Sequence, residues 1–238
     1  MSRKVAAVVG VGPGLGLAVA RKFARVGYVV AILARDYEKL TKFAEQLAGE
    51  ASAQVAAIRI DCSDAKSIRE AFEAVNSLGP VEVLVYNTSG PFPWPPPKFT
   101  EITAEVFERS LTVSCVGAFH CVQQVVRGMI DRKCGTILFT GATGSIRGSA
   151  GFSQFAAGKF ALRALGQSLA RELQPQGIHV AHIIIDGVIR NKALGGTFAV
   201  EEKTLSPDAI AEAYWQLHIQ DKSTWTQELD LRPFSEKF

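Results

Sequence analysis

The sequence lacks the features that mark a metal site, a disulfide framework or a membrane span. Its four cysteines form no C-x-x-C pair, and its four histidines are scattered without metal-ligand spacing. We therefore expect no metal site, and buried or half-buried thiols that stay reduced in a reducing compartment, the cytoplasm. No run of about 18 or more apolar residues occurs, so no transmembrane helix and no membrane partner are predicted.

The chain also lacks a large excess of charge of either sign. The formal net charge is +3, and the basic residues form no stripe with interleaved aromatics, so we expect no nucleic-acid partner. Apolar residues make up 47% and charged residues 21% of the chain, a balance typical of folded globular proteins. No linker or shift in composition divides the 238 residues, so one domain over residues 1–238 is predicted.

The chain does have a regular alternation of short β-branched runs and amphipathic stretches. The runs predict strands at Val5–Val9, Val29–Leu33, Gln54–Ile60, Val81–Tyr86, Gly135–Thr140 and Ile178–Ile185. The amphipathic stretches predict helices at Gly14–Gly27, Tyr37–Leu47, Ser67–Leu78, Ala104–Ser110, Thr112–Asp131 and Ser153–Leu173. This order predicts an α/β fold, with a doubly wound parallel sheet in a three-layer α/β/α arrangement.

One segment interrupts the alternation after the fourth predicted strand. It reads Pro91-Phe92-Pro93-Trp94-Pro95-Pro96-Pro97, and this density of proline excludes the interior of a helix or a sheet. We expect a stiff, extended loop there. The loop is either a surface connector or the wall of a pocket at the carboxyl end of that strand.

A glycine-rich turn follows the first predicted strand and opens the first predicted helix. Glycine allows the backbone to approach a pyrophosphate, and the free N–H groups of a helix N-terminus attract its charge. A glycine-rich turn in this position is typical of a dinucleotide site. The predicted contacts are Gly10, Gly12, Pro13, Gly14, Leu15 and Gly16.

The glycine spacing is G-x-x-x-G-x-G, which resembles the short-chain dehydrogenase/reductase family, with Val9 in place of that family's threonine. The resemblance extends from Val5 to about Arg232. It implies a Rossmann-type fold of about seven strands and a nicotinamide-dependent oxidoreductase that acts on a small carbonyl or alcohol substrate. It also implies a homodimer or homotetramer, a substrate lid near residues 189–206 and a last edge strand at Trp225–Leu229.

The end of the second predicted strand decides between NADP(H) and NAD(H). An acidic side chain there would bind the ribose diol and repel a 2′-phosphate, but the position holds Ala34 and Arg35 follows it. Arg35 can pair with a 2′-phosphate, so NADP(H) is favoured. NAD(H) remains possible if Arg35 is a solvated charge and Asp36 contacts the ribose.

The same resemblance implies further cofactor contacts, at positions that follow the third, fourth and sixth strands. The first two groups would contact the adenine and pass beneath the cofactor, and the last would meet the nicotinamide carboxamide. These residues are Asp61 and Cys62, then Asn87, Thr88, Ser89 and Gly90, and finally Gly187 and Ile189.

The family's catalytic positions are mostly altered. Of its Tyr-x-x-x-Lys pair, Lys159 is present, and the resemblance implies that it holds the nicotinamide ribose, but Phe155 replaces the tyrosine. Ala142 stands at the serine position and Ser114 at the asparagine position. Phenylalanine has no ionisable proton, so it cannot serve as a general acid or base.

Asp186 follows the sixth predicted strand, where the family has proline. It is either a relocated acid or base beside the cofactor or a turn residue that bonds nearby backbone N–H groups. Two functions are compatible with these residues. One is an NADP(H)-dependent oxidoreductase with a non-standard active site, and the other is a catalytically silent NADP(H)-binding sensor or scaffold protein.

Overall fold

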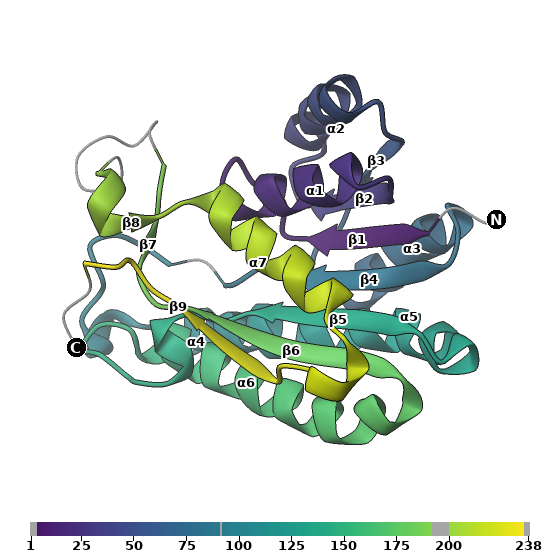
Figure 1. The fold of residues 1–238 in the computed structure, drawn as a ribbon. Helices are drawn as coiled ribbons and strands as arrows, with labels where there is room; N and C mark the ends of the chain where they lie inside the picture. The colour runs from purple at the N-terminus through teal and green to yellow at the C-terminus, as the bar shows by residue number, and fades with distance from the viewer. Residues whose placement is uncertain (1–3, 91, 192–199, 236–238) are drawn as a thin grey trace.

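Strands and helices alternate along the chain (Figure 1), and the structure, a computed structural model, describes residues 4–90, 92–191 and 200–235. The strands are β1 (Val5–Val9), β2 (Val29–Ala34), β3 (Val55–Arg59), β4 (Val81–Tyr86), β5 (Gly135–Thr140), β6 (Ile178–Ile185), β7 (Val188–Ile189), β8 (Thr204–Leu205) and β9 (Glu228–Leu231). The helices are α1 (Leu15–Arg25), α2 (Tyr37–Ala51), α3 (Ala65–Ser77), α4 (Ala104–Leu111), α5 (Gly117–Arg132), α6 (Ser153–Leu173) and α7 (Pro207–Ile219), with a π-helical turn at Thr112–Val116.

The main sheet has seven parallel strands in the order β3-β2-β1-β4-β5-β6-β9, and β7 pairs with β8 beside it. The chain runs outward from β1 to β3 and then crosses back to β4 on the other side of β1. In sheets of this kind, ligands bind outside the carboxyl ends of the strands at this reversal. The predicted doubly wound parallel sheet is confirmed.

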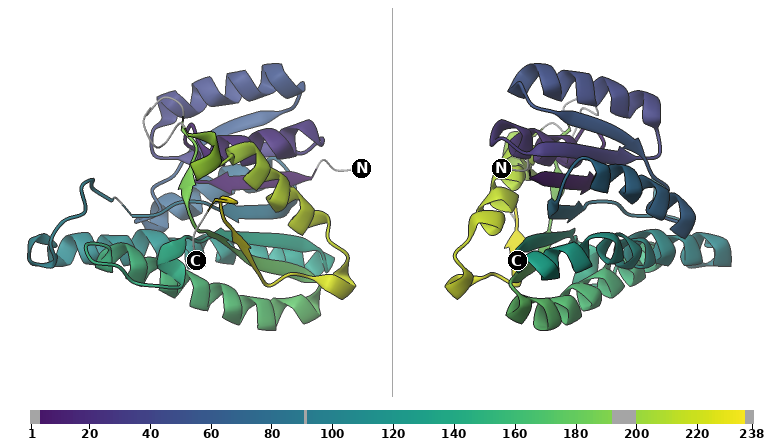
Figure 2. Two further views of the ribbon diagram at one scale, coloured as in Figure 1. Left: turned by 60° about the vertical axis from the view of Figure 1, so that its left-hand side comes forward. Right: turned by 90° about the vertical axis from the view of Figure 1, so that its right-hand side faces the viewer.

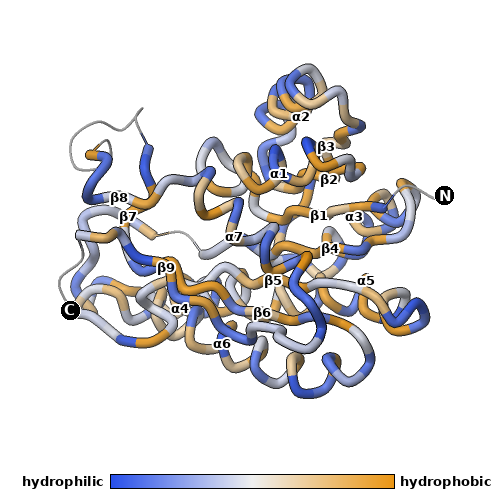
Figure 3. Tube along the Cα trace, viewed as in Figure 1, coloured by the Kyte–Doolittle hydropathy of each residue, from blue (hydrophilic) through white to orange (hydrophobic). Residues whose placement is uncertain are grey.

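Helices cover both faces of the sheet (Figure 2), and each face carries its own hydrophobic core. Helices α1, α2 and α7 cover one face, and α3, α5 and α6 cover the other. The central strands are apolar along their length (Figure 3), and every residue of β1 is buried, because a strand covered on both faces has no solvent side. Phe23 and Tyr214 lie in the first core, and Phe72 and Phe139 in the second.

The structure moves several predicted boundaries. Helix α2 continues to Ala51, and α3 begins at Ala65 because the Asp64 side chain accepts a hydrogen bond from the Lys66 N–H. The last edge strand is β9, not Trp225–Leu229. Trp225 stacks flat on His179, with ring centroids 4.9 Å apart, and its indole N–H donates to the Gln220 carbonyl, so the loop before β9 holds it.

Helix α7 and strands β7 and β8 were not predicted from the sequence. A signal for α7 was present, since Ser206 and Pro207 precede an acidic first turn, and the buried residues Ile210, Ala211, Tyr214 and Leu217 share one face. Strands β7 and β8 have two residues each, too few to show a period of two.

Several other expectations concern single features. The part of the chain that the structure describes contains no helix long and apolar enough to cross a membrane, and no cluster of metal-ligating side chains. Cys134 is exposed, contrary to the expectation of buried or half-buried thiols. The predicted lid near 189–206 is described only at its two ends, which form β7 and β8, because residues 192–199 lie outside the described residues.

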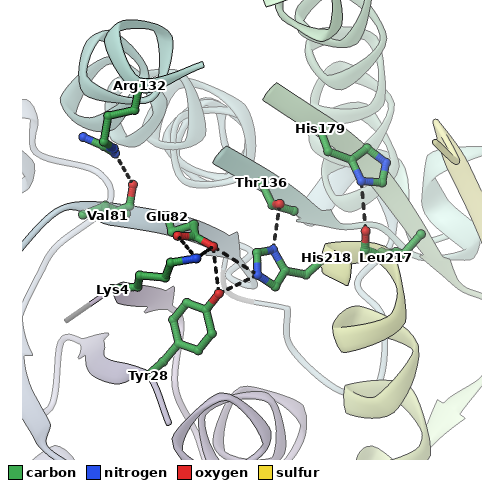
Figure 4. A network of polar contacts seen from close by, with 9 residues as sticks. All are labelled: Lys4, Tyr28, Val81, Glu82, Arg132, Thr136, His179, Leu217 and His218. Carbon is green, nitrogen blue, oxygen red and sulfur yellow. Dashed lines mark hydrogen bonds and ion pairs between the residues drawn. The ribbon is translucent and has the colours of Figure 1, made fainter. Parts of the chain in front are cut away.

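A polar network lies at the amino ends of the strands, at the end of the sheet opposite to the carboxyl ends outside which ligands bind (Figure 4). The His218 ring contacts the Tyr28 hydroxyl at 2.7 Å and the Thr136 hydroxyl at 2.8 Å, and Tyr28 donates to Glu82 at 2.9 Å. Lys4 forms an ion pair with Glu82 at 2.9 Å. The network joins β1, β2, β4, β5 and α7. Burial lowers the pKa of His218 from 6.5 to about 4.

We expect the protein to lose stability in mild acid. As the pH falls below 6.5, the unfolded chain binds a proton at His218 before the folded chain does, and this difference persists to about pH 4. The loss approaches about 3 kcal/mol at the acid limit. Urea denaturation at steps of about half a pH unit, from about pH 7.5 to about pH 4.5, measures how the free energy of unfolding changes with pH. Burial also lowers the pKa of His182 to about 4 and lowers that of His179, so these residues contribute to the slope of the same dependence. His218→Gln keeps hydrogen-bonding capacity and should make the slope shallower, and an unchanged slope in that variant would contradict the assignment.

Candidate functional site

The turn between β1 and α1 is packed against the carboxyl end of β4. Gly10 has a φ of +92°, and a Cβ there would lie 2.8 Å from backbone atoms of Asn87 and Thr88. The Asn87 side chain donates to the Gly10 carbonyl at 3.0 Å. A Cβ on Gly16 would come within 2.6 Å of that same carbonyl oxygen. Gly10 and Gly16 are therefore needed to close the turn.

Gly12 and Gly14 border open space instead. A Cβ at either position would meet no atom within 4 Å. Helix α1, which begins directly after Gly14, has no side-chain cap and no acidic residue in its first turn, so its first N–H groups keep their partial positive charge. This cradle of exposed backbone fits a phosphate group.

A first cavity, the Arg35 cavity, occupies about 290 Å³ at the carboxyl ends of β1, β2 and β4. It brings together eight residues that were predicted to bind cofactor, their chain neighbours Val11, Ala34 and Ile60, and also Arg109 and Val113, which were not predicted. Those two come from α4 and the π-helical turn, and no pattern in the sequence places that segment over β3. The lining residues are Gly10, Val11, Gly12, Ala34, Arg35, Ile60, Asp61, Cys62, Asn87, Thr88, Ser89, Arg109 and Val113.

Asp61 is held in its ionised form at the floor of the Arg35 cavity. The Ser63 hydroxyl and N–H donate to its Oδ1 at 2.7 and 2.9 Å, and these bonds are the main cause of its lowered pKa. Arg109 lies 4.0 Å from the other carboxylate oxygen. The cavity lining holds two positive side chains, Arg35 and Arg109, and one negative side chain, Asp61. This excess of positive charge favours an anionic ligand.

A second cavity, the Lys159 cavity, adjoins the first and occupies about 340 Å³. The two share Gly10, Gly12, Asn87 and Ser89, so they form one trough along the carboxyl edge of the sheet. The second is lined by Gly10, Gly12, Gly14, Leu15, Gly16, Asn87, Ser89, Thr140, Gly141, Ala142, Phe155, Lys159, Ile185, Gly187 and Ile189. Four predicted site residues line neither cavity: Pro13, Gly90, Ser114 and Asp186.

Lys159 is buried at the base of its cavity. Its ammonium donates to the Thr140 carbonyl at 2.8 Å and to the Thr88 carbonyl at 3.4 Å. Burial lowers the pKa of Lys159 to about 8, because a charged group loses hydration in the protein interior. The side chain can therefore hold or release a proton near neutral pH.

Phe155 and Ala142 stand beside Lys159 without any hydroxyl to offer. The Lys159 ammonium lies 6.0 Å from the centroid of the Phe155 ring. The Ala142 N–H donates to the Ser145 hydroxyl at 3.1 Å, and Ser145 is fully buried. The nearest serine to position 142 is thus used in the loop and does not line the Lys159 cavity.

Ser114 and Gly90 serve helix packing. Ser114 lies in the π-helical turn, fully buried, and its hydroxyl has no partner in the described structure. It faces α6, since a Cβ on Gly158 would come within 2.8 Å of that hydroxyl. A Cβ on Gly90 would lie 2.7 Å from the Cα of Ser110, so this glycine lets the segment after β4 approach α4 closely.

The Asp186 carboxylate interacts with three neighbouring side chains. It pairs with Arg232 at 2.8 Å and Arg147 at 3.8 Å, and it accepts a hydrogen bond from the Thr143 hydroxyl. Asp186 is buried, yet these partners compensate its charge. The partners of the carboxylate are thus side chains, whereas the turn interpretation expected backbone N–H groups.

Comparison with known proteins gives consistent matches over most of the chain. A family model described as short chain dehydrogenase matches residues 4–194. A solved short-chain dehydrogenase from Rhodopseudomonas palustris is 35% identical, with a TM-score of 0.84 over 97% of this chain and 99% of that one. An alcohol dehydrogenase from the archaeon Thermococcus sibiricus, complexed with 5-hydroxy-NADP, is 28% identical, with a TM-score of 0.87 over 99% and 98%.

Two curated relatives differ in length. An uncharacterized oxidoreductase from Staphylococcus epidermidis is 25% identical over 234 residues and covers 98% of both chains. A 3-dehydrosphinganine reductase from Danio rerio is 30% identical over 182 residues, which cover 73% of this chain and 53% of that protein. The chain therefore spans about half the length of that reductase.

Proposed function

Because the chain belongs to the short-chain dehydrogenase family, we propose that it is an NADP(H)-dependent oxidoreductase that interconverts a carbonyl and an alcohol with a non-standard active site. The observation that carries this proposal is the continuous trough from Arg35 to the buried Lys159. The NADP derivative bound to the Thermococcus sibiricus enzyme supports the same choice of cofactor.

The chain's own residues have separate roles in this proposal. When bound, NADP(H) would supply the hydride that adds to the carbonyl carbon. The cradle of Gly12 and Gly14 faces the pyrophosphate, and Arg35 pairs with the 2′-phosphate. Among the described residues that line its cavity, Lys159 is the only charged one. It holds the nicotinamide ribose and is the proton source for the carbonyl oxygen, directly or through water.

We extend the proposal to assembly and to the lid. Val116 and Phe119 near the start of α5 and Phe160 on α6 are 45%, 43% and 41% exposed, an apolar surface that supports a homodimer or homotetramer formed through these helices. The segment near 189–206 follows Gly187 and Ile189 at the edge of the Lys159 cavity, a position that suits a lid over the substrate.

The decisive experiment is a titration of wild type and Arg35→Ala with NADPH and NADH, followed by tryptophan fluorescence. Loss of a charge-assisted pair costs about 1.5–3 kcal/mol, so NADPH binding should weaken roughly 10–100-fold in the variant while NADH binding stays the same. Arg69→Ala, an exposed change on α3 that lines neither cavity, is the matched control.

Two results would contradict the proposal in different ways. Equal loss of NADPH and NADH affinity would remove Arg35 from 2′-phosphate recognition. Tight NADPH binding without any consumption across a broad set of carbonyls and alcohols would instead identify a sensor or scaffold protein.

A further inference from the structure

Three phenylalanine rings make a continuous aromatic surface beside Lys159. Phe92 stacks on Phe152 with ring centroids 4.6 Å apart and an interplanar angle of 20°. Phe92 also meets Phe155 edge to face, with centroids 5.6 Å apart. All three rings are half-buried, so each keeps exposed surface. We call Phe92, Phe152 and Phe155 the aromatic wall.

The wall joins two segments that are distant in the sequence. Phe92 comes from the proline-rich loop after β4, whereas Phe152 and Phe155 lie at the start of α6. The two segments touch at Gly151, where a Cβ would lie 2.7 Å from the Pro96 side chain. Gly151 has a φ of +80°, which favours glycine there. Prolines restrict the loop's backbone, so Phe92 is held over α6.

The wall continues into a cavity that has a single charged side chain among its described lining residues. Phe155 belongs to both, since its ring also lines the Lys159 cavity. The other side chains around that cavity are apolar at Ala142 and Ile185 and at the predicted cofactor contacts Leu15 and Ile189, and polar but uncharged at Asn87, Ser89 and Thr140. Lys159 is the only charged residue among the described lining residues, and its ammonium already donates to two backbone carbonyls. Among the described lining residues no carboxylate could pair with a cationic substrate, and in the proposed reaction the Lys159 ammonium is directed at the carbonyl oxygen.

We propose that the substrate is an uncharged ketone or aldehyde with an aromatic or bulky apolar substituent, which lies on the aromatic wall while its carbonyl faces Lys159. This inference rests on the proposed oxidoreductase function and names its substrate class. The absence of a hydroxyl at position 155 then has a second meaning, because the bare ring extends the apolar surface that the substituent contacts. Aromatic rings favour stacked or edge-to-face contacts with one another.

The reaction adds a hydride to the carbonyl carbon and a proton to its oxygen, so NADPH is oxidised as the ketone becomes an alcohol. The test compares NADPH consumption with acetophenone, pyruvate and dihydroxyacetone. We expect kcat/KM for acetophenone to exceed the other two roughly a hundredfold, which is the range available to apolar contacts. A preference for pyruvate or dihydroxyacetone would overturn the proposal.

Substitutions in the aromatic wall test whether it causes the preference for acetophenone. Phe92→Ala and Phe152→Ala should raise KM for acetophenone about tenfold or more, with NADPH affinity unchanged. Phe92→Leu keeps apolar volume but removes the ring, and should give a smaller increase. Phe99→Ala is the matched control, because Phe99 follows the same loop, is 77% exposed and has no ring contact among the described residues. Unchanged KM in the folded Phe92→Leu and Phe152→Ala variants would overturn the wall.

A binding measurement separates this inference from the proposed function. Saturation-transfer NMR of acetophenone with the NADP⁺-loaded protein requires no turnover. Binding in wild type that is lost in Phe92→Ala would support the wall even if no carbonyl were reduced, a result that would defeat only the oxidoreductase proposal. Turnover of carbonyls with no dependence on Phe92 would keep the oxidoreductase and defeat the wall.

Discussion

The Phe155→Tyr, Ala142→Ser double variant is expected to reduce carbonyls about two to four orders of magnitude faster than the wild-type protein. Both positions line the Lys159 cavity, so the new hydroxyls would lie beside the buried ammonium. Its positive charge lowers the pKa of a nearby tyrosine hydroxyl, and this prepares it to exchange a proton with the carbonyl oxygen. The tyrosine keeps the ring of position 155, so the aromatic wall is preserved.

The measurement is kcat with acetophenone at saturating NADPH for wild type, the two single variants and the double variant. The single variants should each gain less than the pair, because hydroxyls that act as a unit are not additive. NADPH affinity should stay constant across the series. A double variant that binds NADPH normally but reacts at the wild-type rate would show that the proton path runs elsewhere.

Lys159→Met is expected to lower kcat/KM roughly a hundredfold or more, because it removes the only charged group that lines its cavity in the described structure. The variant should fold normally, since methionine fills similar space without a buried charge to desolvate. In wild type, activity that depends on the ammonium form should fall as the pH rises through about 8, the pKa that burial gives Lys159.

A pH profile of kcat/KM in wild type, together with single-pH rates in Lys159→Met, checks both parts. Lys66→Met, an exposed change on α3, is the matched control for loss of a lysine charge. If kcat/KM of the wild type did not change between about pH 7 and about pH 9, Lys159 would not supply the proton. Near-normal turnover in Lys159→Met would remove it from the reaction altogether.

Most of the fold could be predicted because its signals are local. Buried parallel strands appear as short β-branched runs, and the turn at Gly10 marks the first crossover. The ends of elements were less certain because tertiary contacts set them. Trp225 was placed in the last strand, but its ring stacks on His179, and β9 begins only at Glu228.

The candidate site was predictable where a motif carries it. The glycine turn and Lys159 are short patterns, and both line the trough. Contacts between distant segments left no pattern to find. Arg109 reaches the Arg35 cavity from α4, Phe92 reaches Phe152 from another loop, and Arg232 pairs with Asp186 from beyond β9. Each depends on packing that one sequence does not display.

The network of Lys4, Tyr28, Glu82, Thr136 and His218 fastens five elements at the amino end of the sheet, whereas every side chain of the trough lies at the carboxyl end. Changes at one end leave the fastening at the other intact, since well-separated sites act almost independently. Because of this separation, residues of the trough can be substituted with little effect on the stability that the network provides. Hydroxyls can therefore be introduced at positions 142 and 155 without weakening this network.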